Sequence, residues 1–123
     1  MNKTSHSFSR KKSAAGHALL GPVQVAAVAD LFAVLSEPTR LRILQLLQAG
    51  PASVGEMVET LDLKQANASK QLGILLAAGV LRREQQGNRA IYSIAMPLVN
   101  DLCGLVCTGL AQHASERAAA LAE

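Results

Sequence analysis

The sequence predicts a mainly α-helical domain that carries a small β-hairpin, an α+β fold. Apolar residues recur at three- and four-residue spacing along most of the chain, as on the buried face of a helix. Two short segments, at 80–85 and 89–95, instead flank a Gln86-Gly87-Asn88 turn whose Gly and Asn tolerate the positive φ of a hairpin. The chain has 123 residues, of which 50% are hydrophobic and 17% charged, and this suits one globular domain with its own core.

Proline, glycine and capping residues mark the ends of the first two expected helices. Pro22 suits a first helical turn, and the apolar spacing then continues over 22–35. Ser36 is expected to cap the next helix, with Glu37 in its first turn. Gly50-Pro51 ends that helix.

The middle of the chain predicts two shorter helices joined by a tight turn. Ser53 and Glu56 have the S-x-x-E spacing of a capping box, which starts a short helix. The turn at 62–64 leads into a helix over 65–78. The stripe of this helix that is expected to be buried consists of Ala68, Leu72, Leu75 and Leu76.

Two strands and a long helix complete the domain. Strands are expected over 80–85 and 89–95, and Pro97 opens a helix that extends toward residue 118. Two short helices with a tight turn, followed by a two-stranded wing, form a winged helix-turn-helix. The strand register is expected to place Leu81 and Arg83 opposite Ile91 and Ser93.

The positive charge is concentrated in two places. The formal net charge is +3, but residues 1–18 alone hold four basic residues and no acid. Residues 64–89 hold five basic residues against Glu84 alone. Such a basic stripe on an otherwise slightly acidic domain indicates that one face of the protein binds a polyanionic partner. The alternative is that this charged face only contacts solvent.

Composition excludes several classes of protein. Three aromatic residues are too few for a stacking platform that binds single-stranded nucleic acid. Two cysteines exclude a disulfide-dense secreted scaffold, and no apolar run approaches the roughly 18 residues of a membrane span. The sequence has no glycine-rich phosphate loop and no paired acid and base, so we do not expect an enzyme.

An exported protein is a further alternative, because basic residues at 10–12 precede an apolar stretch that ends in Ala27-Val28-Ala29. Gly21, Pro22 and Gln24 interrupt that stretch, and cleavage after it would remove most of a predicted helix. We therefore expect a cytoplasmic protein with no membrane partner.

Five segments in order resemble the ArsR/SmtB family of bacterial regulators, over about residues 25–110. They are LSEPTRLRIL at 35–44, SVGEM at 53–57, LKQANASKQL at 63–72, LAAGV at 76–80 and AIYSI at 90–94. The resemblance implies a homodimer formed by the first and last helices. It also implies a helix over 65–78 that reads double-stranded DNA, and a wing that grips the backbone or minor groove. Many family members are repressors that a metal ion or a thiol-reactive signal releases.

These inferences divide the chain into three segments. Residues 1–18 are expected to form a disordered basic tail. Residues 19–118 form the winged helix-turn-helix domain for DNA binding and dimerisation, and 119–123 a frayed C-terminus. A winged helix that serves only as a protein-interaction module, without specific DNA binding, is the alternative function.

The candidate DNA-binding residues lie on the helix over 65–78 and on the wing. Gln and Asn pair with adenine, and Lys reaches guanine or phosphate, when a helix enters the major groove. Arg on the wing suits the minor groove or the backbone. At position 64 the family usually has a capping Ser, and Lys cannot accept that hydrogen bond. The candidates are Lys64, Gln65, Asn67, Ser69, Lys70, Gln71, Arg82, Arg83 and Arg89.

Cys103 and Cys107 are the candidate sensing residues. The C-x-C pair of the family's arsenic sensors is missing at 53–55, and Pro97, Val99 and Leu110 occupy ligand positions of the family's zinc site. No cofactor is therefore required. The two cysteines share one helix face, so a two-fold axis would bring four thiols together for Zn²⁺, Cd²⁺ or arsenite, or for oxidation. The alternative is that both cysteines only pack.

Overall fold

The computed structural model describes residues 19–122, so the expected tail at 1–18 lies outside the described residues. The chain divides after Ala33 into two compact units. The first unit contains most of helix α2, Pro22–Leu35, which has the predicted bounds. Most side chains of α2 are exposed, including its apolar ones, with Val23 82% and Phe32 55% exposed.

Helix α3 spans Pro38–Gln48, and its predicted N-cap, Ser36, is wrong by one residue. Glu37, not Ser36, is the N-cap, and its carboxylate accepts a hydrogen bond of 2.8 Å from the backbone N–H of Arg40. The reason is Pro38, which lacks an N–H and fits the first helical position, so the cap falls on the residue directly before it. Ala49 and Gly50 end the helix as expected.

The two short helices of the helix-turn-helix are confirmed. Helix α4, Val54–Leu61, begins with the predicted capping box. The Ser53 N–H donates to Glu56 at 2.8 Å, and the Glu56 N–H donates to the Ser53 hydroxyl at 3.3 Å. Asp62 takes a left-handed conformation with φ 54°, which turns the chain toward helix α5, Gln65–Ala77.

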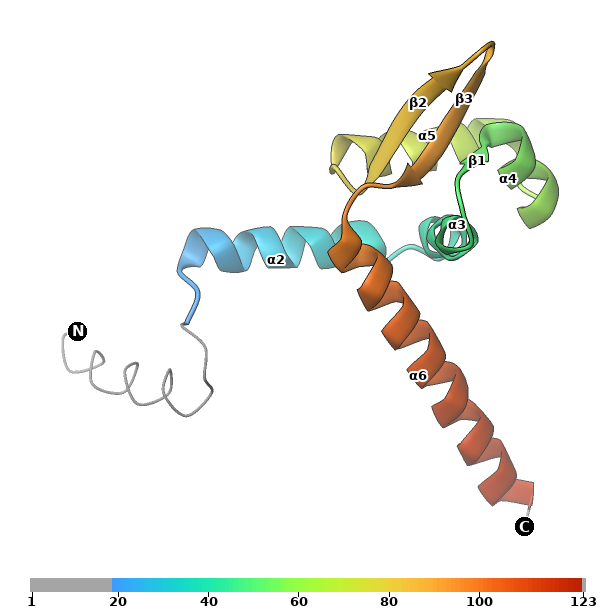
Figure 1. Cartoon of the computed structure of the whole chain (residues 1–123). Coiled ribbons are helices and arrows are strands. Elements are labelled where there is room, and N and C mark those ends of the chain that lie inside the picture. The colour runs from blue at the N-terminus through green and yellow to red at the C-terminus, as the bar shows by residue number, and fades with distance from the viewer. Residues whose placement is uncertain (1–18, 123) are drawn as a thin grey trace. The chain divides into compact units, whose positions relative to one another are not determined.

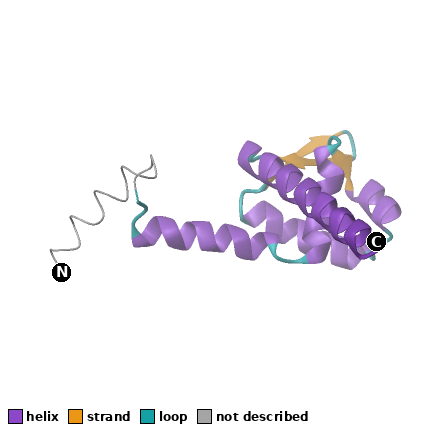
Figure 2. Ribbon diagram, turned by 90° about the horizontal axis from the view of Figure 1, so that it is seen from below, coloured by secondary structure: helices purple, strands orange, loops and turns teal. Residues whose placement is uncertain are grey.

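Three strands form one antiparallel sheet in the order β1-β3-β2, in orange in Figure 2. β2 is Leu81–Gln86 and β3 is Arg89–Ile94; together they form the wing. β1, Ala52–Ser53, was not predicted because two residues show no alternation.

The predicted strand register is wrong by one residue. Leu81 lies opposite Ile94, and Arg83 opposite Tyr92. The turn sets this register: Gln86 pairs with Arg89, so only two residues remain between the strands, and Gly87 supplies the positive φ of 66° that such a turn needs.

Helix α6, Pro97–Ala122, continues past the predicted end near residue 118. It turns Val99 and Cys103 inward, whereas Leu98, Leu105 and Leu110 are more than 60% exposed. These three apolar side chains of α6 thus lie outside the core of a single chain. Within residues 19–122, no helix is both long enough and apolar enough to span a membrane.

The core of the second unit forms around α3. Ile43 and Leu44 have no exposed surface, and α3 packs against α4, α5, α6 and β3. Figure 1 shows α3 end-on, between the wing and the long α6. The other fully or nearly fully buried apolar side chains are Leu35, Leu47, Ala52, Met57, Ala68, Leu72, Leu75, Val80, Leu81, Tyr92, Val99 and Cys103.

Replacing Ser53 by Ala removes one half of the capping box, so we expect Ser53→Ala to lower the free energy of unfolding by about 1 kcal/mol. Urea denaturation measures this change. Ser69→Ala is the matched control, because Ser69 is exposed inside α5, where Ala has the higher helix propensity. A loss in the control as large as in Ser53→Ala would contradict a role for the cap.

Candidate DNA-binding surface

Helix α5 holds a polar face outward because its opposite face is fixed in the core. Ala68, Leu72 and Leu75 are at most 1% exposed and fasten the helix against α3, α4 and β2. Leu76, expected in the same stripe, is half-buried. The candidate residues Gln65, Asn67, Ser69 and Lys70 are all exposed. Their amides, hydroxyl and ammonium group supply the donors and acceptors that base edges and phosphates require.

Gln71 differs from the prediction, because it is buried with 6% of its surface exposed. Its Oε1 accepts a hydrogen bond of 2.9 Å from Nη1 of Arg40 on α3. Its Nε2 donates a hydrogen bond of 3.1 Å to Oδ1 of Asn67, one turn earlier. Gln71 therefore connects the core to the exposed face, and we withdraw it from the residues that touch DNA directly.

The N-terminus of α5 lacks a side-chain cap. Lys64 is the N-cap residue and makes no side-chain capping hydrogen bond, as its chemistry requires. The N–H groups of a first helical turn carry partial positive charge, and an uncapped turn is a site that favours phosphate oxygen. The exposed ammonium group of Lys64 adds to that field.

The wing carries the remaining basic candidates. Arg82 and Arg83 are both exposed, although they point to opposite faces of β2, because the strand is exposed from Arg82 to Gln86. Both guanidinium groups are therefore accessible to phosphate.

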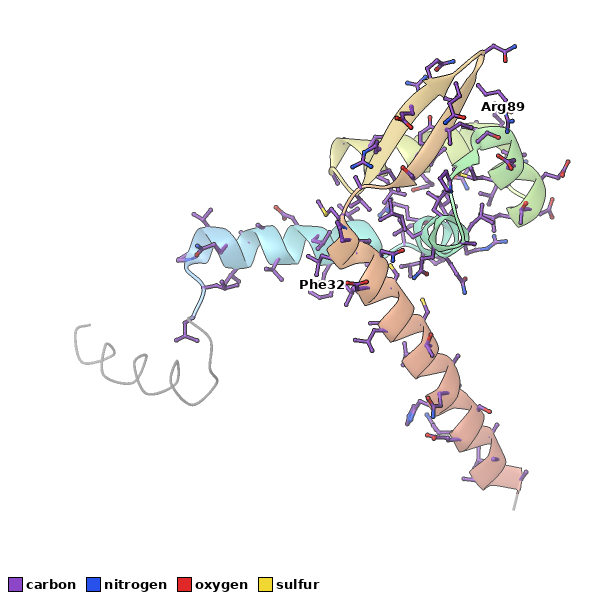
Figure 3. All side chains as sticks on the ribbon, in the orientation of Figure 1. Phe32 and Arg89 are labelled. Carbon is purple, nitrogen blue, oxygen red and sulfur yellow. The ribbon has the colours of Figure 1, made fainter. Side chains whose placement is uncertain are left out.

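Arg89, at the start of β3, is held by α4. Its Nη2 donates hydrogen bonds of 3.0 Å to Oε1 of Glu56 and to Oγ of Ser53. Figure 3 labels Arg89. The Arg89 side chain remains 57% exposed. Sequence reasoning missed this ion pair, because 33 residues separate the two partners and only the pairing of β1 with β3 brings them together.

The capping box lowers the pKa of Glu56. The largest cause is the hydrogen bond from the Ser53 backbone N–H, followed by that from the Ser53 hydroxyl; the charge of Arg89 contributes less. All three stabilise the carboxylate form. The wing and α4 thus meet at one exposed corner whose charges are partly paired.

The two cysteines lie one turn apart on α6, with Cys103 buried and Cys107 half-buried, and both are free thiols. Burial raises the pKa of Cys103, and the neighbouring Cys107 raises it further. A thiol of raised pKa is a poor nucleophile and a poor metal ligand. Among residues 19–122, no group of three or more His, Cys, Asp or Glu side chains could hold a metal ion. Sensing at these thiols stays a prediction.

Comparisons with known proteins agree with this geometry. A family model for a helix-turn-helix domain matches residues 35–84, from the end of α2 into the wing. The HTH-type transcriptional regulator Rv0081 of Mycobacterium tuberculosis is 42% identical over 94 residues, which are 76% of this chain and 82% of that protein. The chain belongs to the ArsR/SmtB family. It is a DNA-binding transcriptional regulator and not an enzyme.

Two further relatives support the assignment to this family. The biofilm growth-associated repressor of Xylella fastidiosa is 34% identical over 85 residues, 66% of this chain and 75% of that protein. The solved homodimeric winged helix-turn-helix domain of Mb0332 from Mycobacterium bovis, a possible ArsR-family regulator, gives a TM-score of 0.70 at 28% identity over 76% of this chain and 87% of that one. The crystal structure of Rv0081 gives 0.68 at 38% identity, over 80% and 99% of the two chains.

The lowered pKa of Glu56 makes a prediction about acid stability. The ion pair and capping box should contribute stability above the pKa of an unfolded Glu, about 4.3, and lose it as the pH falls through the lower folded value. Carboxyl NMR titration measures this pKa. In Arg89→Ala it should rise but stay below the usual value, because Ser53 is the larger cause. A return to the usual value in Arg89→Ala would contradict this ranking.

Proposed function

We propose that this chain acts as a homodimeric repressor that binds an inverted-repeat operator, with the exposed face of α5 in the major groove. The observation that carries the proposal is that face itself. Four exposed polar side chains at its N-terminal turns stand on a helix whose opposite stripe is buried. The basic wing follows directly in the chain, as backbone contacts beside a recognition helix require.

A second copy of the chain explains the apolar surface of two helices. α2 exposes Val23, Val25, Val28 and Phe32, the last labelled in Figure 3. Exposed apolar side chains that recur along one helix indicate an interaction surface. α6 separately exposes Leu98, Leu105, Val106 and Leu110. The homodimeric state of the Mb0332 domain supports pairing through these helices in the present chain.

The symmetry of the proposed dimer defines the kind of operator. Two recognition helices related by a two-fold axis read the same sequence on opposite strands, so the operator is an inverted repeat with half-sites about one helical turn apart. Repression, rather than activation, is proposed because the Xylella fastidiosa relative is named a repressor. A dimer seated on an operator within a promoter excludes polymerase from the same DNA.

The double variant Gln65→Ala/Asn67→Ala removes two amides from the proposed reading face. Each specific base contact contributes about 1–3 kcal/mol of discrimination, so the preference for operator over random duplex should fall toward none. Fluorescence anisotropy with both duplexes at one salt concentration measures this ratio, and size-exclusion chromatography checks that the dimer persists.

Gln45→Ala/Asn100→Ala is the matched control for that experiment. It removes the same two functional groups from exposed positions on α3 and α6, away from the polar face of α5. The control should keep the preference of the unmodified chain. An unchanged preference in the α5 variant would refute α5 as the reading helix. Weak, sequence-indifferent DNA binding by the unmodified chain would favour a protein-interaction module instead.

A further inference from the structure

A chain of three side chains links the start of α3 to the exposed face of α5. Arg40 donates from Nε to the backbone oxygen of Val34 at 2.6 Å, and from Nη1 to Gln71 at 2.9 Å. Gln71 then donates from Nε2 to Oδ1 of Asn67 at 3.1 Å. Asn67 is exposed, whereas Gln71 is buried, so the chain starts inside the protein and ends at its surface.

The chemistry of Arg40 fixes the direction of every hydrogen bond in this chain. A guanidinium group has donors and no acceptor, so Gln71 must turn its carbonyl oxygen toward Arg40. The NH₂ end of the Gln71 amide then points to Asn67, which must accept through Oδ1. A flip of the buried Gln71 would set NH₂ against guanidinium and leave the Arg40 donor without an acceptor.

We propose that Arg40 and Gln71 are positioning residues that hold the Asn67 amide with its Nδ2 donors toward DNA. The inference rests on the proposed function, because it assumes that α5 lies in the major groove. Asn67 would then prefer a base that presents a hydrogen-bond acceptor in the major groove, namely a purine N7, guanine O6 or thymine O4.

The hydrogen bond from Gln71 restricts Asn67 to fewer base partners than an unrestrained asparagine has. A free Asn amide rotates and pairs bidentately with adenine, accepting from N6 and donating to N7. At Asn67, the hydrogen bond from Gln71 holds Oδ1 toward Gln71 and takes one of its two lone pairs, so the amide cannot rotate freely. Donation through Nδ2 then becomes the main readout. A residue that does not touch DNA thereby selects a base.

Gln71→Glu reverses the last hydrogen bond and tests the proposal. The carboxylate still accepts from Arg40, but it has no donor for Asn67 and accepts from Nδ2 instead. Asn67 then presents Oδ1 to DNA. We expect the preferred base at one position of each half-site to change from an acceptor edge to adenine N6 or cytosine N4. The change should be about fivefold or more in relative affinity.

The measurement is competition binding of the full-length chain to operator duplexes that carry each single base-pair change in both half-sites. Thermal unfolding and size-exclusion chromatography check that each variant is a folded dimer. Gln71→Met, which is uncharged and similar in length, provides a second variant if the buried carboxylate prevents folding. It frees Asn67 to rotate, so the preference at that one position should relax while the others stay.

Two controls separate positioning from direct contact. In an Asn67→Ala background, Gln71→Glu should cause no further change in preference at that position, because Gln71 acts through Asn67. Gln45→Glu adds the same charge at an exposed position of α3, outside the polar face of α5, and should leave the base preference unchanged.

Three outcomes would overturn the inference. The first is an unchanged base preference in Gln71→Glu and Gln71→Met while the unmodified chain binds specifically. The second is a change that persists without Asn67, which would make Gln71 a direct DNA contact. The third is an unmodified chain with no sequence preference at all, which would refute the proposed function as well and is thereby distinguishable from the other two.

Discussion

The burial of α3 is the constraint on which the rest of the winged domain depends. Ile43 and Leu44 lose all their exposed surface, and the helix that carries them packs on α4, α5, α6 and the wing strand β3. Burying such side chains is worth about 1.5–3 kcal/mol each, so α3 fixes how its neighbours are turned. The outward polar face of α5 is a consequence, since its inner stripe can face only α3 and the elements beside it.

Hydrogen bonds and ion pairs between polar side chains set the finer geometry of helices and strands that apolar packing has already placed. Arg40 joins α3 to α5 through Gln71, and Arg89 joins the wing to the capping box of α4. Each guanidinium group has several donors, so one side chain holds two partners at once. Basic residues in this protein therefore do two things: some are exposed and free to meet phosphate, and others set the geometry of the surface that meets it.

Local signals were sufficient to predict most elements. The apolar spacing over 22–35, the capping box at Ser53 and the turn at Gly87 act within a few residues, and each is confirmed. Two errors were local: the cap of α3 falls beside Pro38, and the two-residue turn shifts the strand register by one. The others arose where residues distant in the sequence decide the structure. Gln71 has the sequence character of an exposed residue, but Arg40, 31 residues away, supplies the hydrogen bond that makes its burial tolerable. The two-residue β1 and the pairing of Arg89 with Glu56 likewise depend on strand pairing that no local pattern contains.

The central claim is that the N-terminal face of α5 and the wing together form the DNA-binding surface. Amide chemical-shift mapping by NMR tests it directly, with the labelled full-length chain titrated with a duplex from its own upstream DNA. The account predicts the largest shifts at 64–71 and 82–89, with small shifts in the second half of α6. Shifts confined to α2 or to α6 beyond Cys107, with α5 unchanged, would contradict it.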